Sequence, residues 1–166
     1  MDSQRTSRLL LLSGVVIVVA LVLVGLGVLP QPWSDDRAEV RIVGDDGTTK
    51  ATIDAEVADT ARERYVGLSE HDSLEPGEGM LFVHAVERER TYVMRDMDFD
   101  IEMLFVGADG EVTTIHHARA PEPGEDGEEL RYTGRAKWVL EVPAGTVEEA
   151  GIDVGDEVQI TSERSG

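Results

Sequence analysis

The sequence of 166 residues contains no cysteine and only two lysines, Lys50 and Lys137. Without cysteine the chain forms no disulfide bond and no thiolate metal site, and a lipid anchor on an N-terminal cysteine is excluded. It also lacks a phosphate-binding loop, a dinucleotide fingerprint, a kinase signature and the Gly-x-Ser-x-Gly turn of serine hydrolases. We therefore find no catalytic motif, and the sequence assigns no catalytic residue, no metal and no cofactor.

Basic residues are few, with 15 Lys and Arg against 34 Asp and Glu, which gives a net charge of −19. These negative charges repel one another in dilute salt, but at 1 M salt the repulsion is screened over a distance of about 3 Å. Together with the scarcity of lysine, this charge predicts a halophilic protein whose surface is adapted to high salt. It also excludes nucleic-acid binding as an expected function, because phosphate contacts need a basic face.

One long apolar run is present, and it covers the 21 residues of 9–29. A helix of that length rises roughly 31 Å, about the thickness of the hydrocarbon core of a bilayer. Arg5 and Arg8 precede the run, and by the positive-inside rule they keep the N-terminus in the cytoplasm. A cleaved signal peptide is the alternative, although its apolar stretch is usually only about 7 to 15 residues and ends at a small-x-small site.

The apolar run divides the chain into four parts. We predict a cytoplasmic N-terminus over 1–8, a transmembrane helix or signal anchor over 9–29, a linker over 30–37 and a soluble domain over 38–162. The protein would cross the cell membrane once, and its C-terminal domain would be extracytoplasmic.

The soluble part is predicted to be mainly β (α+β), a compact antiparallel β-barrel-like domain with two short helices. Short runs rich in apolar and β-branched residues, separated by turn formers, predict the strands. One helix is expected to begin after Thr60, because Glu63 three residues later completes a capping box, and to end at Gly67. The second is a single turn over 146–150. The strands are expected at 40–57 as a hairpin, 80–84, 91–95, 103–106, 112–118, 138–142 and 157–161.

Several separated blocks resemble, in the right order, the domain of unknown function family number 192 (DUF192), over roughly residues 55 to 160. They are TARERYVGLSEHDSL, GEGMLFVH, YVMRDMDFDIEMLFV, ADGEV and AKWVLEVPAGTVEEAGIDVGDEV. The resemblance implies a small β-rich domain, exported or tethered to a membrane, and no established activity comes with it. The positions that match the family's motifs are Arg64, Gly67, Leu68, Gly79, Met80, Leu81, Phe82, Met94, Val139, Leu140, Glu141, Ala144 and Gly145.

The segment around Met94 departs from the family pattern. Val93 replaces a Trp, and Arg95-Asp96-Met97 replaces Lys-Asn-Thr. Further along, Asp100 replaces Pro and Glu102 replaces Asp, and His71 stands where an Arg is typical. If the family shares a site in this segment, the present chain has altered it.

Three charged residues lie among apolar neighbours in the matching blocks: Arg64, Glu102 and Glu141. Burying a charge without a partner costs several kcal/mol or more. We therefore predict that Arg64 pairs with Glu102 or Glu141. With Met94 and Asp96, these residues form either a structural ion pair or the polar end of a ligand pocket.

Two other groups of residues resemble metal ligands. Asp96, Asp98, Asp100 and Glu102 alternate with apolar residues, and a strand would place them on one face. We interpret them as a solvated acidic face with weak cation binding at most. Thioethers suit copper(I), but we interpret the methionines as core filler. These are Met80, Met94, Met97 and Met103.

The sequence leaves the function unknown, and two hypotheses follow from it. The first is a membrane-tethered extracytoplasmic binding or accessory module, whose partner is a protein or a small molecule. The alternative is an envelope-associated enzyme acting on a small extracellular molecule through a cleft near Arg64 and Glu102. A deep pocket with a perturbed acid would favour the enzyme, and a flat solvated surface would favour the module.

Overall fold

The computed structural model describes residues 36–163 of the chain. The predicted membrane segment 9–29, the N-terminus 1–8 and most of the linker 30–37 lie outside the described residues, and these assignments stay predictions. Within 36–163, no helix is long and apolar enough to cross a membrane.

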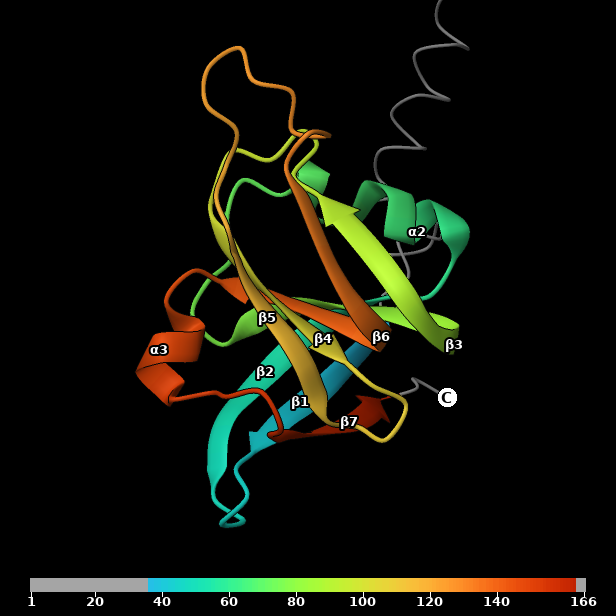
Figure 1. The fold of residues 1–166 in the computed structure, drawn as a ribbon, viewed down its shortest axis with the longest axis vertical. Helices are drawn as coiled ribbons and strands as arrows, with labels where there is room; N and C mark the ends of the chain where they lie inside the picture. Colours follow the sequence, from blue (N-terminus) through green and yellow to red (C-terminus); the bar gives the residue numbers. More distant parts are fainter. Residues whose placement is uncertain (1–35, 164–166) are drawn as a thin grey trace, which may run out of the picture. The chain divides into compact units, whose positions relative to one another are not determined.

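Seven strands form one sheet in the order β5-β4-β6-β3-β2-β1-β7, and the sheet curls into a half-barrel (Figure 1). At one end the two edge strands approach each other, because Glu111 and Glu157 form an isolated bridge. The mainly β prediction is therefore confirmed, but the barrel is only half formed. The strands are β1 (Arg37–Val43), β2 (Thr49–Ala58), β3 (Glu78–Val93), β4 (Ile101–Val106), β5 (Val112–Ala118), β6 (Arg131–Pro143) and β7 (Glu157–Glu163).

The sheet is mixed, which corrects the antiparallel prediction. β2 and β3 run parallel, with Ala55 opposite Gly79, whereas the other neighbouring strands are antiparallel. Parallel neighbours need a crossover connection rather than a tight turn. Here the crossover contains helix α2 (Ala61–Val66) and the 3-10 turn η1 (Gly67–Glu70).

The two predicted helices are both present. In α2 the side chain of Thr60 accepts a hydrogen bond from the main-chain N–H of Glu63, and the Glu63 carboxylate accepts one from that of Thr60. This is the predicted capping box, and α2 ends at Gly67, whose φ is 52°. The second helix, α3, covers Thr146–Ala150.

The predicted acidic face does not form. The chain makes a turn between β3 and β4, where Asp96 adopts a positive φ of 54° that interrupts any strand. Asp96, Asp98 and Asp100 are exposed on this loop, whereas Glu102 lies in β4 and is buried. The four carboxylates therefore share no face, because the period-two argument holds only for continuous strand.

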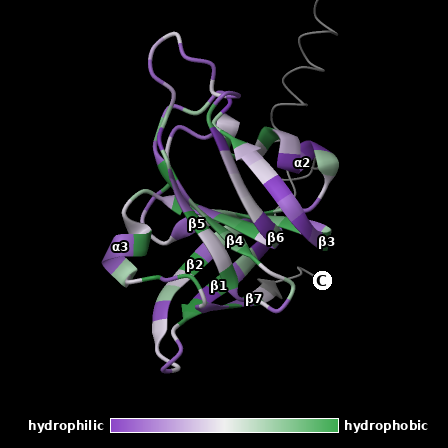
Figure 2. Ribbon diagram, in the orientation of Figure 1, coloured by the Kyte–Doolittle hydropathy of each residue, from purple (hydrophilic) through white to green (hydrophobic). Residues whose placement is uncertain are grey.

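The curled sheet packs apolar side chains on both faces, and Figure 2 shows hydrophobic residues along its central strands. One cluster is built around Val40, Ile42, Leu104 and Leu140. The other contains Phe82, Phe105, Met80, Met94, Met97 and Met103, so the four methionines lie in the core as predicted.

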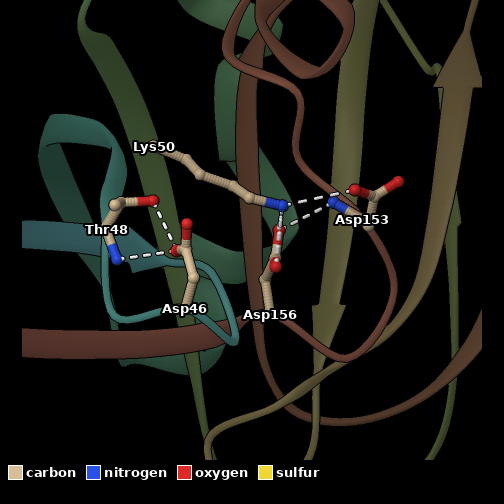
Figure 3. Close-up of polar contacts among 5 residues, drawn as sticks. All are labelled: Asp46, Thr48, Lys50, Asp153 and Asp156. Atoms are coloured by element: carbon tan, nitrogen blue, oxygen red, sulfur yellow. Dashed lines mark hydrogen bonds and ion pairs between the residues drawn. The ribbon is translucent and has the colours of Figure 1, made fainter.

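One of the two lysines pairs with the acids of the turn before β7. The ammonium of Lys50 donates to both carboxylate oxygens of Asp156, at 2.9 and 2.8 Å, and to Asp153 at 3.2 Å (Figure 3). Asp156 is only 5% exposed. Since Lys50 is the second residue of β2 and Asp156 directly precedes β7, the contact ties the β1–β2 hairpin to the turn before β7. The hydrogen bond to Asp156 is the largest cause that raises the pKa of Lys50.

Replacing Lys50 with methionine is expected to lower the melting temperature, because Asp156 then lies buried without a cation. Lys50 has a folded pKa above its ordinary 10.5, so its stabilisation is present below pH 10.5 and is lost as the pH rises through the folded pKa. The difference from wild type should therefore shrink in strong alkali. The control is Lys137→Met, which removes the other lysine from above the Trp138 ring. Equal melting losses for both variants would contradict this role.

Candidate functional site

A pocket of about 450 Å³ lies between α2 and β3. Arg64 of α2 borders it, and the remaining lining residues come from β3. These are His84, Arg88, Glu89, Arg90, Thr91, Tyr92 and Val93. Figure 2 shows this part of β3 as a hydrophilic stretch.

Most of the pocket lining lies in β3 beyond a shift in its pairing with β6. The pairing of β3 with β6 shifts register between Val83 and Arg88. Beyond the shift, Arg88, Arg90 and Tyr92 alternate along the strand, which places them on one face. Arg64 is held against this strand, because its guanidinium donates to the main-chain oxygen of Val83 at 2.9 Å and to that of Asp59.

The three arginines of the pocket form no ion pair among the residues that the structure describes. The Nε of Arg90 is buried and has no hydrogen-bond partner there, while its Nη2 donates to the main-chain oxygen of Val86 at 2.6 Å. Other arginines of the domain do pair with carboxylates: Arg37, Arg41, Arg95, Arg119 and Arg135. The pocket lining thus carries three guanidinium groups and one carboxylate, that of Glu89, in a strongly acidic chain.

His84 and Tyr92 form the polar wall of the pocket, with 3.0 Å between the imidazole Nε2 and the phenol oxygen. Burial, followed by the charges of Arg90, Arg64 and Arg88, lowers the pKa of His84 to about 4. His84 is therefore neutral at pH 7. The Tyr92 pKa is raised, first by burial and then by the charge of Glu141.

Glu141 lies in β6 behind this wall and is only 4% exposed. Burial alone raises its pKa to about 8. Its neighbours across the sheet are Met80 of β3 and Met103 of β4. The acid is close enough to Tyr92 to affect its titration, but it is not part of the pocket lining.

The predicted pair of Arg64 with Glu102 or Glu141 is wrong. Arg64 instead donates to main-chain oxygens. Glu102 is adjacent to Met103, which faces the same way as Glu141, so Glu102 points to the opposite face of the sheet. There its carboxylate accepts from the main-chain N–H of Val147 at 2.6 Å and lies 2.6 Å from His117 Nδ1.

The other two residues predicted for the site also lie elsewhere. Met94 is fully buried in the core, and Asp96 is exposed on the loop before β4. Of the five predicted residues, only Arg64 lines the pocket.

Sequence reasoning missed His84, Arg88, Arg90 and Tyr92. A signal was available in ERERTY, where Arg88, Arg90 and Tyr92 recur with the period of a strand in a chain that has few basic residues. No comparable signal connects this strand to Arg64 or His84.

Histidine and carboxylate side chains do not gather into a metal site in the described part of the chain. Among residues 36–163, no group of three or more His, Asp or Glu side chains is placed to hold a metal ion.

Comparison with known proteins supplies the family and the fold. The model of the DUF192 family, described as an uncharacterized ACR, matches residues 42–160. A crystal structure named as a proposed transcription regulator from Sinorhizobium meliloti 1021 is 27% identical, with a TM-score of 0.68 over 80% of this chain and 98% of that one. A protein of unknown function from Novosphingobium aromaticivorans DSM 12444 is 28% identical, with a TM-score of 0.66 over 79% of this chain and 91% of that one. The comparison with curated proteins finds no match.

Proposed function

The chain belongs to the DUF192 family of uncharacterised proteins, and we propose that it is a membrane-tethered extracytoplasmic module that binds a small anionic molecule. The family's fold assigns no activity, so the support for this function comes from the pocket. The tether is the apolar segment 9–29, and the basic residues before it favour an outward-facing domain.

The observation that carries the proposal is the group of three arginines around one pocket, none of which forms an ion pair within residues 36–163. Arg64, Arg88 and Arg90 all act on the pKa of His84, so their charges lie close together. The three guanidinium groups repel one another, and the large excess of carboxylates in the chain does not remove this repulsion. An anion in the pocket would relieve it. Guanidinium groups also suit carboxylate and phosphate oxygens, to which they donate two parallel hydrogen bonds.

The dimensions favour a small ligand. A volume of about 450 Å³ lies in the lower part of the range, roughly 300 to 1,000 Å³, that is typical of small-molecule sites. A transcription-regulator function, which is the name given to the Sinorhizobium protein, does not suit this chain, because a net charge of −19 opposes contact with DNA phosphates.

Binding is favoured over the alternative of an enzyme with a cleft near Arg64 and Glu102. The two side chains do not meet, because Glu102 lies on the other face of the sheet and bonds to α3. The pocket lining also contains no activated nucleophile of the kind that covalent catalysis needs.

The first test is anion binding by the full chain in detergent, measured by calorimetry with sulfate and succinate as probes. Replacing Arg64 or Arg90 with glutamine should weaken binding about tenfold or more, since a hydrogen bond to a charged group contributes about 1.5 to 3 kcal/mol. The control is Arg41→Gln, because Arg41 pairs with Glu39 away from the pocket. No binding by wild type, or an equal loss in the Arg41 variant, would overturn the proposed function.

Sulfate binding is also expected to become tighter as the pH falls from 7 toward the His84 pKa of about 4. An anion beside the imidazole favours its charged form and raises its pKa, so binding takes up a proton. The affinity for sulfate therefore rises as the imidazole becomes protonated. The largest possible rise equals the factor by which bound sulfate increases the proton affinity of the imidazole. Sulfate serves as the probe because it does not itself titrate in this range. Replacing His84 with glutamine should flatten the dependence, and an unchanged slope would exclude His84 as its source.

A further inference from the structure

Two methionines and a glutamate lie side by side across the centre of the sheet. Met80 of β3 and Met103 of β4 are the Cα partners of Glu141 in β6, one on each side. Both pairings are antiparallel, and directly opposed residues in such pairs have Cβ atoms about 4.5 to 5.5 Å apart on the same face. The carboxyl group of Glu141 is thus flanked by two thioether side chains.

This carboxyl group has no partner among the residues that the structure describes. No hydrogen bond or ion pair contributes to its titration, which burial alone perturbs, and the residue is 4% exposed. An unpaired acid inside an apolar cluster weakens the fold, and an apolar residue of the same size would pack there without that cost. Packing therefore does not explain why Glu is present at this position.

The row offers Glu141 two thioether sulfurs as its nearest neighbours, and His116 of β5, the Cα partner of Met103, comes next in the row. Met80 and Met103 belong to the apolar cluster that also contains Met94 and Met97. Thioethers are soft ligands that select monovalent ions such as Cu(I), whereas Ca²⁺ and Mg²⁺ require six or more oxygen ligands. Met94 and Met97 come from the end of β3 and the following loop, and are not part of the row across the sheet.

We propose that Met80, Glu141 and Met103 form a binding site for a soft monovalent cation, Cu(I) or Ag(I), on the face of the sheet that carries this apolar cluster. The cation replaces the proton of the carboxyl group, so binding releases one proton and the bound carboxylate balances the charge of the ion. This proposal is independent of the anion pocket, because none of the three residues lines that pocket.

The test titrates the full chain in detergent with Ag(I), which has no accessible redox step, and repeats the titration with Cu(I) against a chromophoric chelator. We expect one cation per chain, with proton release seen as a buffer-dependent heat. Met80→Leu and Met103→Leu should each weaken binding at least tenfold. Glu141→Gln should also weaken it and should abolish the proton release.

Methionine to leucine conserves volume, so these variants are expected to fold, and their melting curves establish that they do. Met97→Leu is the matched control, since it removes a thioether from the same cluster but not from the row. Wild type that binds no Ag(I), or full affinity in the Met80 and Met103 variants, would overturn the proposal. An equal loss in the Met97 variant would overturn the assignment to these three residues.

Discussion

Replacing Glu141 with glutamine is expected to stabilise the folded domain at neutral and alkaline pH and to remove a large part of its pH dependence. Burial raises the Glu141 pKa from 4.5 to about 8, so folding disfavours the charged form. A tenfold change in the acid dissociation constant corresponds to about 1.4 kcal/mol. The expected gain in the free energy of unfolding is therefore about 3 kcal/mol at pH 7, with a limit of about 5 kcal/mol above pH 8.

The sign follows from the raised pKa. In the wild-type protein, Glu141 does not lower the free energy of unfolding below pH 4.5. The free energy of unfolding falls as the pH rises from 4.5 to 8, because the buried carboxyl group stays protonated while that of the unfolded chain becomes charged, and it falls no further above pH 8. Glutamine has no charged form, so the gain should be near zero at pH 4.5 and should grow up to pH 8. Urea unfolding of both proteins at several pH values measures this difference directly.

The control for Glu141 is Glu56→Gln. Glu56 lies in the same row across the sheet, opposite Met80, but its side chain is 43% exposed. A gain for the Glu141 variant that does not change with pH, or an equal gain for Glu56, would contradict burial as the cause. A more stable Glu141→Gln protein would also show that any loss of Ag(I) binding by this variant is not due to unfolding.

A second large effect is expected from Gly79→Ala, which should lower the free energy of unfolding by about 3 kcal/mol. A Cβ at Gly79 would lie 2.7 Å from the main-chain oxygen of Glu141 and 2.9 Å from Cγ2 of Ile53. The first contact is with backbone in the middle of the sheet, so neighbouring strands must move apart. Gly79 begins the Gly-Met-Leu-Phe block and also lies at the parallel junction of β2 and β3.

The matched variant is Gly77→Ala, two residues earlier. Gly77 has a φ of +88° but nothing within 4 Å of an added Cβ, so it tests backbone strain without a clash. We expect it to cost about 1 to 2 kcal/mol. Urea unfolding measures the free energy of unfolding of both variants. A smaller loss for Gly79→Ala than for Gly77→Ala would contradict the expected clash, because it would show that the strands move apart at little cost.

Local features of the fold could be predicted because they depend on residues close together in the sequence. The capping box of Thr60 and Glu63 joins residues three apart, and it defines the start of α2. The methionines are buried as predicted, since apolar side chains enter the core whatever the topology. The family blocks likewise identified the domain that the structure shows.

The site could not be predicted in the same way, because its residues meet only through strand pairing. Periodicity shows that Glu102 and Glu141 each occupy one face of a strand, but it does not show which face packs against Arg64. The register between β4 and β6 places the two acids on opposite faces, so only one of them could face Arg64. Arg64 donates to main-chain oxygens instead, and the predicted ion pair does not form. A one-residue change of register would have placed both acids on one face.

The sequence by itself determined the membrane-length apolar segment 9–29, the acidic charge and a β-rich domain of the DUF192 family. Composition, period and local capping carry this information because each involves a short stretch of chain. Only the tertiary structure decided that β2 and β3 pair in parallel and that Arg64 lines one pocket with Arg88 and Arg90. It also decided that Glu141, which has no partner within residues 36–163, lies between two methionines. These are contacts between distant segments, and they follow from how the strands close into one curled sheet.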